Sequence, residues 1–124
     1  MKYLYPKGAT SVTIEVFIPD SASTTGAGKT GLAFNTASLT AYYTRTRAAA
    51  VAITLATQTV TGAFSSGGFV EIDATNMPGW YRLDVPDAML ASGVDRVGLQ
   101  LKGASGMAPC NLEIQLTGAN LKDA

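Results

Sequence analysis

The chain has 124 residues, enough for one domain whose hydrophobic core needs no cross-links. Nine Lys and Arg residues balance nine Asp and Glu residues, so there is no basic field to hold a nucleic-acid backbone. The absence of histidine excludes the usual catalytic triads and histidine metal clusters, and the single cysteine excludes zinc thiolate sites and an intrachain disulfide.

Residues 1–9 are expected to form an N-terminal arm. This segment lacks the apolar run of a signal peptide, and no run approaches the ~20 apolar residues that cross a bilayer. Period-two alternation of apolar and polar residues then predicts seven strands. They cover residues 11–18, 38–45, 50–57, 69–73, 80–85, 95–102 and 110–116. Turn residues separate them, and this pattern is typical of a two-sheet β-sandwich.

Alternation along each strand also predicts which side chains face the core. The inward positions are expected to be Val12, Ile14, Val16, Ile18, Leu39, Ala41, Tyr43, Val51, Ile53, Leu55, Val70, Ile72, Tyr81, Leu83, Val85, Val97, Leu99, Leu101, Cys110, Leu112, Ile114 and Leu116. Cys110, the lone thiol, is therefore interpreted as a small apolar core residue.

Three aromatic side chains fall on outward positions, and such residues serve as interface anchors or sugar platforms. They are Trp80, Phe69 and Tyr42. Arg82, outward by the same alternation, and Lys29, in a loop over residues 19–31 interpreted as an adaptable arm, complete the candidate contact residues. The alternative is that the protein's own long loops cover these faces.

Short helical and turn segments are predicted at three places. Residues 86–91 favour one helical turn, because Pro86 suits a first helical position and Gly93 can end it. Residues 47–50 tolerate a helix but are assigned to a hairpin loop, since strand-like alternation resumes at once. Residues 77–80 favour a type II turn, because Pro78 fixes φ and Gly79 accepts positive φ.

The spacing of Gly79, Tyr81 and Leu83 is similar to the tyrosine corner of immunoglobulin-like sandwiches, in which a tyrosine hydroxyl bonds to upstream backbone. The alternative reading is an ordinary buried tyrosine on a strand. Both readings place Tyr81 inside.

Residues 25–30, Thr-Gly-Ala-Gly-Lys-Thr, look like the end of a phosphate-binding P-loop. That motif requires glycine at position 23, where Ser23 stands, and a helix directly after it. No helix is predicted there, so the segment is interpreted as a Gly/Ser/Thr-rich loop.

Acidic residues crowd one region of the sequence: Glu71, Asp73, Asp84, Asp87 and Asp95. A glycosidase would need two carboxylates facing each other about 5–10 Å apart in a cleft. Strand alternation instead predicts surface charge pairs with Arg82 and Arg96. Asp73 and Asn76 offer oxygens for calcium, without a full ligand set. No catalytic, cofactor or metal site is expected.

Residues 67–81, Gly-Gly-Phe-Val-Glu-Ile-Asp-Ala-Thr-Asn-Met-Pro-Gly-Trp-Tyr, closely resemble a family of small immunoglobulin-like domains in virion proteins of tailed bacteriophages. The likeness continues through 83–88 and 107–110, and earlier through 31–32, 39–43 and 52–55; residues 76–81 are its specific part. The resemblance covers most of residues 10–118. It implies a structural protein without catalytic residues. Because the sequence ends at Ala124, without a fibre-like extension, we expect a compact accessory part.

The resulting prediction is one immunoglobulin-like β-sandwich over residues 1–124, with 119–124 as a C-terminal tail. Charged residues make up only 15% of the chain, against about 25% on average, which is typical of a subunit with covered faces. We expect a non-enzymatic virion protein, made in the host cytoplasm and docked on tail, baseplate or capsid as an adaptor or decoration. Its partners would be other virion proteins and copies of itself, not nucleic acid or membrane. The alternative function is a carbohydrate-binding module that stacks host glycans on Trp80 or Tyr42.

Overall fold

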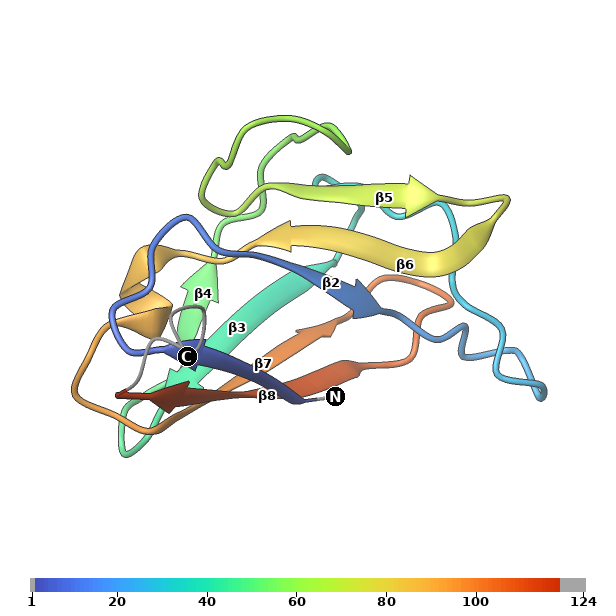
Figure 1. Cartoon of the computed structure of the whole chain (residues 1–124). Helices are drawn as coiled ribbons and strands as arrows, with labels where there is room; N and C mark the ends of the chain where they lie inside the picture. The colour runs from blue at the N-terminus through green and yellow to red at the C-terminus, as the bar shows by residue number, and fades with distance from the viewer. Residues whose placement is uncertain (1, 119–124) are drawn as a thin grey trace.

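Two β-sheets packed face to face account for almost all regular structure in the computed structural model, which describes residues 2–118 (Figure 1). The expected tail, 119–124, lies outside the described residues. The strands are β1 (Lys2–Pro6), β2 (Thr13–Phe17), β3 (Thr40–Arg45), β4 (Val51–Ile53), β5 (Phe69–Asp73), β6 (Met77–Asp84), β7 (Arg96–Lys102) and β8 (Cys110–Thr117). One 3-10 turn, η1 (Asp87–Leu90), is the only helical element of the described chain. The predicted all-β sandwich is confirmed.

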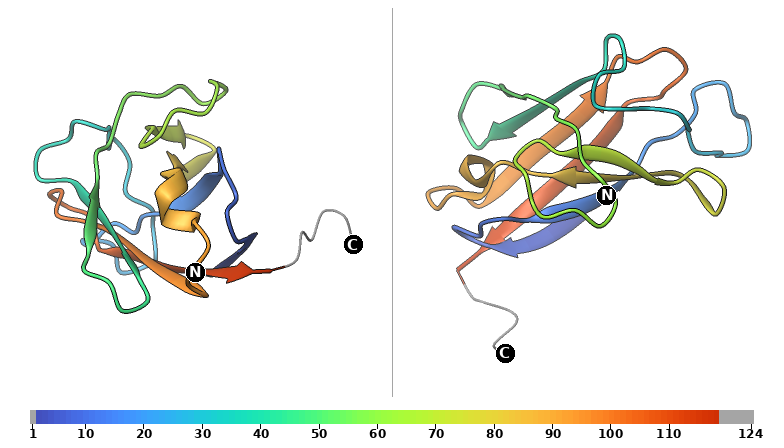
Figure 2. Two further views of the ribbon diagram at one scale, coloured as in Figure 1. Left: turned by 90° about the vertical axis from the view of Figure 1, so that its left-hand side faces the viewer. Right: turned by 90° about the horizontal axis from the view of Figure 1, so that it is seen from above.

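The strands are divided between the sheets in the immunoglobulin-like manner. One sheet has the order β2-β6-β5 and the other the order β1-β8-β7-β3-β4. In immunoglobulin domains strands B, E and D share one sheet and C, F and G the other; β2, β6 and β5, and β3, β7 and β8, take these places. Figure 2 shows the same two layers from two further sides.

The segment expected to be an arm contains a strand. β1 runs parallel to β8, with Lys2 opposite Glu113 and Pro6 opposite Thr117. Tyr3 and Tyr5 pack against the core, while Leu4 between them is exposed. This strand was not predicted because its partner comes from the far end of the sequence, and no local turn indicates such a pairing.

Most side chains predicted to face inward do so. The buried ones are Ile14, Val16, Ile18, Ala41, Tyr43, Ile53, Tyr81, Leu83, Val85, Val97, Leu99, Leu101, Cys110, Leu112, Ile114 and Leu116. Val12, Leu39 and Leu55 are partly buried against this core. Val51 was predicted to be inward, but it is 46% exposed. It lies on β4, a strand of only three residues at the edge of the sheet.

Strand β5 has the opposite facing from the one predicted. Phe69, expected outward, is buried, and Val70 and Ile72 are only half-buried. Phe69 lies opposite Leu83 in the register, and cross-strand partners share a face of the sheet. Its ring stacks on that of Tyr81 at 5.0 Å between centroids. Alternation in a run of five residues with an apolar residue on both faces does not identify the buried face.

The type II turn predicted at residues 77–80 is also wrong, because β6 already begins at Met77. The chain reverses over residues 74–76, where the Asp73 carboxylate accepts the backbone N–H groups of Thr75 and Asn76. Gly79 has a φ of 93° inside the strand, where the β5–β6 register shifts. The positive φ expected at Gly79 is present, but it serves a bulge rather than a turn.

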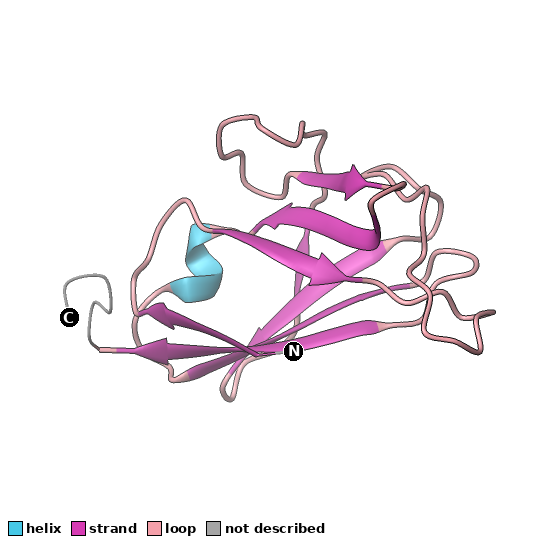
Figure 3. Ribbon diagram, turned by 45° about the vertical axis from the view of Figure 1, so that its right-hand side comes forward, coloured by secondary structure: helices cyan, strands magenta, loops and turns pink. Residues whose placement is uncertain are grey.

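The two remaining local predictions are confirmed. The helical turn is η1, which starts after Pro86, buries Met89 and Leu90 and lies at one end of the sandwich (Figure 3). Residues 46–50 connect β3 to β4 as a hairpin loop. None of the helical structure within residues 2–118 is long and apolar enough to span a membrane.

Candidate contact surfaces

The loop over residues 54–66 covers the part of the outer face of the three-stranded sheet that carries Arg82 and Asp84. Arg82 lies on this face and is only 8% exposed. Its Nη1 donates to the carbonyl oxygens of Thr59 (3.0 Å) and Val60 (3.1 Å). Figure 2 shows the loop arching over the sheet. Arg82 therefore holds this loop on the sheet and is not exposed, in contrast to the outward position that alternation predicted.

Asp84, predicted to be a surface charge, is completely buried beneath the same loop. Its carboxylate pairs with Arg82, with Oδ1 at 2.9 Å from Nε and Oδ2 at 3.2 Å from Nη2. It also accepts hydrogen bonds from the hydroxyl of Thr13, the side-chain amide of Gln58 and the backbone N–H of Ser65. Burial raises the pKa of this carboxyl, but the five hydrogen bonds outweigh it and hold the pKa below its ordinary value.

Trp80 remains on the outer side of β6 but is half-buried. It lies opposite Phe17 on β2, and the two rings pack at 5.8 Å in a tilted arrangement. Phe69, its expected neighbour on this face, is inside the core. Two of the three candidate aromatic anchors are thus engaged within the protein itself.

Lys29 and its loop are tied down by backbone hydrogen bonds. The N–H of Lys29 donates to the carbonyl of Ile18 (2.8 Å), and its carbonyl accepts the hydroxyl of Tyr81 (2.7 Å). That hydroxyl also accepts the N–H of Leu32, and burial is the main cause that raises the pKa of Tyr81 to about 12. The loop is anchored, which differs from the adaptable arm expected here. As predicted, no helix follows the glycines of residues 25–30.

Tyr81 does bond to upstream backbone, as the tyrosine-corner reading predicted. However, β6 occupies the place of strand E, whereas a tyrosine corner belongs to strand F. Tyr81 is thus not a tyrosine corner. Its hydrogen bonds to Lys29 and Leu32 hold the loop between β2 and β3 against the central strand of the three-stranded sheet.

The other acidic residues are dispersed and hold local structure. Asp87 accepts the backbone N–H of Ser11, Asp95 forms an ion pair with Lys7, and Glu71 accepts the N–H of Gly31. Within residues 2–118 no three His, Cys, Asp or Glu side chains gather in a way that could hold a metal ion. Cys110 is buried as expected, and burial raises the pKa of its thiol to about 11.

Tyr42 is the one aromatic candidate that the structure leaves open to solvent, at 43% exposure. It lies on the outer surface of the five-stranded sheet, opposite Ala52 on one side and Gln100 on the other. Gln100 in turn lies opposite Asn111, to which its side-chain amide donates at 2.6 Å. We call this line of neutral side chains, Ala52, Tyr42, Gln100 and Asn111, the Tyr42 row.

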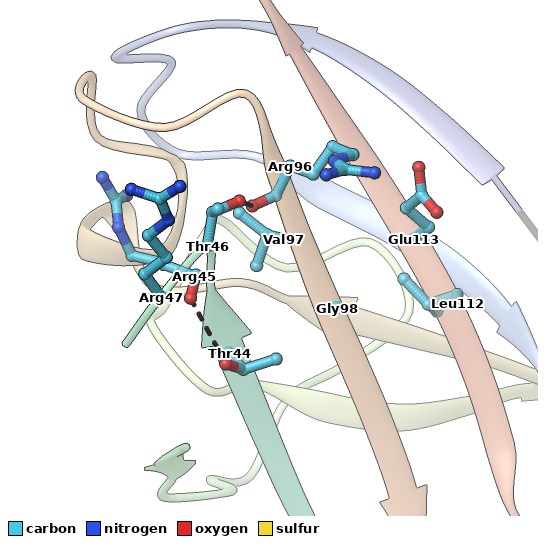
Figure 4. A pocket seen from close by; sticks show the side chains of 9 residues that line it. All are labelled: Thr44, Arg45, Thr46, Arg47, Arg96, Val97, Gly98, Leu112 and Glu113. Atoms are coloured by element: carbon cyan, nitrogen blue, oxygen red, sulfur yellow. Dashed lines mark hydrogen bonds between the residues drawn. The ribbon is translucent and has the colours of Figure 1, made fainter. Parts of the chain in front are cut away.

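A shallow cavity of about 350 Å³ opens beside the Tyr42 row, and all the residues that line it are neutral. A second cavity of about 440 Å³ lies further along the same sheet face, at the end where β3 turns into β4 (Figure 4). Charged side chains line the second cavity, including Arg47, Arg96 and Glu113. Gly98 borders both cavities, so a position without a side chain separates Tyr42 from the charged end.

Gln100, Asn111 and Gly98 were not singled out from the sequence. Each occupies an outward position of a predicted strand, so alternation places it on the surface. Alternation does not say which strands are neighbours. The register that aligns Tyr42 with Gln100 and Asn111 joins residues far apart in the sequence and was not predictable from them.

The strand order and the two sheets define the class of the protein as an immunoglobulin-like β-sandwich. No family model, curated protein or solved structure matches the chain. The likeness to phage virion domains stays a prediction from sequence.

Proposed function

We propose that this protein is a non-enzymatic structural component of a tailed-bacteriophage virion. It docks in several symmetric copies on the tail, baseplate or capsid as an adaptor or decoration. The Tyr42 row forms the centre of the contact with the neighbouring virion subunit. The proposal is supported by the resemblance of residues 67–81 to phage virion domains and by the composition of the outer sheet face.

The observation that carries the proposal is the distribution of charge around Tyr42. The row contains an exposed aromatic ring and three neutral neighbours, whereas Lys2, Arg96, Lys102 and Glu113 lie on surrounding positions of the same sheet. Protein interfaces have a similar anatomy, with a centre poor in charge, enriched in Tyr, and a polar rim. A tyrosine anchor of this kind is a common hot spot.

The use of the carboxylates is consistent with a structural role. An acid–base pair for hydrolysis needs two carboxyl groups that share a cleft. In this chain Asp84 is buried beneath a loop and paired with Arg82, and Glu71 accepts a hydrogen bond from the backbone N–H of Gly31. Both groups stabilise loops of the sandwich.

Electron microscopy of purified particles that contain this chain tests the proposal. We expect density for the sandwich at symmetry-related positions, with the Tyr42 row against a neighbouring subunit. Tyr42→Ala should lower the occupancy of the chain by about tenfold or more, because truncating a hot spot costs at least 2 kcal/mol. Particles that lack the chain, or that carry it with the Tyr42 row facing solvent, would overturn the proposal.

Met77→Ala is the matched control for this experiment. Met77 has the same 43% exposure as Tyr42 but belongs to the other sheet. Its truncation should leave occupancy unchanged. An equal loss in both variants would indicate a general effect on stability rather than a specific contact.

A further inference from the structure

Arg47 holds a backbone conformation that its side chain disfavours. Its φ is 64°, at the tip of the hairpin loop between β3 and β4. The N–H of Ala48 donates to the carbonyl of Arg45, so residues 45–48 form a tight turn with Arg47 at the third position. Turn positions with positive φ favour Gly or Asn, because a Cβ is strained there. Strained residues of this kind often mark functional sites.

The cations near this turn differ in what they bind. Arg45 donates to the carbonyl oxygens of Ala88, Met89 and Ser92 and so caps the end of η1. By contrast, the guanidinium groups of Arg47 and Arg96 make no hydrogen bond or ion pair within residues 2–118. Both side chains line the cavity of about 440 Å³. It is an open depression on the sheet face, which leaves both guanidinium groups accessible to a ligand.

The two ends of this cavity offer different chemistry. Figure 4 shows Arg47 at one end, whereas Arg96 points to the other end, toward Glu113 on β8. Arg96 donates hydrogen bonds only, and a carboxylate such as Glu113 accepts them. Lys2 stands 3.9 Å from Glu113 on an exposed surface, which leaves the carboxylate accessible. Gly98 between the ends leaves room for a ring.

We infer that this cavity binds an acidic sugar residue, with the carboxylate on Arg47 and ring hydroxyl groups on Arg96 and Glu113. A hydroxyl group both donates and accepts, so it satisfies Glu113 and Arg96 together. A guanidinium binds a carboxylate in a fork geometry. Sulfate or acetate has no hydroxyl group to donate to Glu113, whereas a hydroxylated carboxylate satisfies both the guanidinium groups and Glu113. Arg96 and Glu113 also lie beside the Tyr42 row, but binding of this ligand to the free chain does not require the proposed docking.

Titration of the folded chain with glucuronate, followed by amide chemical shifts in NMR spectra, tests the inference. We expect shifts confined to residues 44–47, 96–98 and 112–113. Glucose lacks the carboxylate and acetate lacks the ring, and each should bind about tenfold or more weakly, as expected for losing hydrogen bonds to charged groups.

Arg47→Gly is the decisive variant because glycine adopts the positive φ without strain. It should weaken glucuronate binding by about tenfold or more, to the level of glucose, while the unfolding temperature is unchanged or higher. Arg96→Gln should weaken glucuronate and glucose alike. Lys102→Gln is the control, since it removes an exposed cation from β7, the strand that carries Arg96, at a position outside the cavity.

Three results would overturn the inference. One is the absence of shifts with glucuronate at any soluble concentration. Another is acetate or sulfate binding as tightly as glucuronate, which would make this a simple anion site. The third is glucuronate affinity that is unaltered in Arg47→Gly.

Discussion

At the scale of single residues, the ion pair of Arg82 and Asp84 is buried and holds the loop over residues 54–66 to the sheet. Its two side chains are almost completely covered, and every contact joins β6 to the loop over residues 54–66 or to β2. Breaking one partner of a buried pair leaves a charge without compensation in a medium that solvates it poorly. The pair therefore decides whether this loop stays closed over the sheet.

Asp84→Asn should lower the free energy of unfolding by about 3 kcal/mol, because the guanidinium of Arg82 loses its counter-charge while buried. Urea denaturation monitored by circular dichroism measures this loss. Asp95→Asn is the control, since Asp95 pairs with Lys7 on an exposed surface. A comparably large loss in the control would contradict the role assigned to burial.

The same pair predicts how stability depends on pH. The pKa of Asp84 is lowered in the folded protein, so the unfolded chain binds the proton more readily. The stabilisation is complete above the unfolded pKa of about 3.9 and disappears as pH falls through the lower folded value. The difference in unfolding free energy between wild type and Asp84→Asn should therefore narrow below about pH 4. A difference that widens on acidification would refute this assignment.

At the scale of elements, β6 is shaped by a contact between two glycines. Gly28, in the loop after β2, packs against Gly79 in the bulge of β6. A Cβ on Gly79 would lie 2.5 Å from the Cα of Gly28 and 2.7 Å from Cε1 of Phe17. The carbonyl of Gly79 also accepts the N–H of Ile18. The bulge at Gly79 therefore packs against the 19–31 loop and helps to hold it in place.

Gly79→Ala should destabilise the protein by about 3 kcal/mol, since it combines positive-φ strain with a backbone clash that cannot relax. Gly26→Ala isolates the first of these causes. Gly26 has a φ of 82° but nothing within 4 Å of an added Cβ, so its cost should be about 1 kcal/mol. Equal losses of unfolding free energy in the two variants would show that the Gly28 contact contributes nothing.

At the scale of the whole molecule, the topology joins distant parts of the chain. β1 pairs with β8, β2 with β6 and β3 with β7, and only the β3–β4, β5–β6 and β7–β8 pairs are sequential hairpins. Each non-local pair closes a long loop before its contacts form. Such architectures fold slowly compared with helical proteins of similar length.

We expect the main refolding phase to fall between about a millisecond and a second. Stopped-flow fluorescence after dilution from urea measures it, and Trp80 is the only tryptophan. Trp80 becomes quenched or shifted when it packs on Phe17, a contact between the non-local strands β2 and β6. A double-jump experiment separates this phase from proline isomerisation in the unfolded chain, which takes tens of seconds. A main phase in microseconds would contradict the topological argument.

By itself, the sequence determined what local chemistry encodes. Alternation located the strands from residue 11 onward, and Pro86 indicated the helical turn. The buried face of a strand was predicted correctly wherever only one face was apolar, as for Val97, Leu99 and Leu101. Tyr42 was correctly placed outward for the same reason. These features depend on residues within a few positions of each other.

Tertiary structure alone decided the features that depend on distant segments. Strand register decides three of them: the parallel pairing of β1, the inward facing of the Phe69 side chain, and the alignment of Tyr42, Gln100 and Asn111. Arg82 and Asp84 are buried because a polar loop from elsewhere in the chain satisfies their hydrogen bonds, and a polar residue whose partners are supplied can be buried at little cost. Periodicity shows how apolar and polar residues alternate along one strand. Which face of the strand is buried depends on the segments that pack against that face.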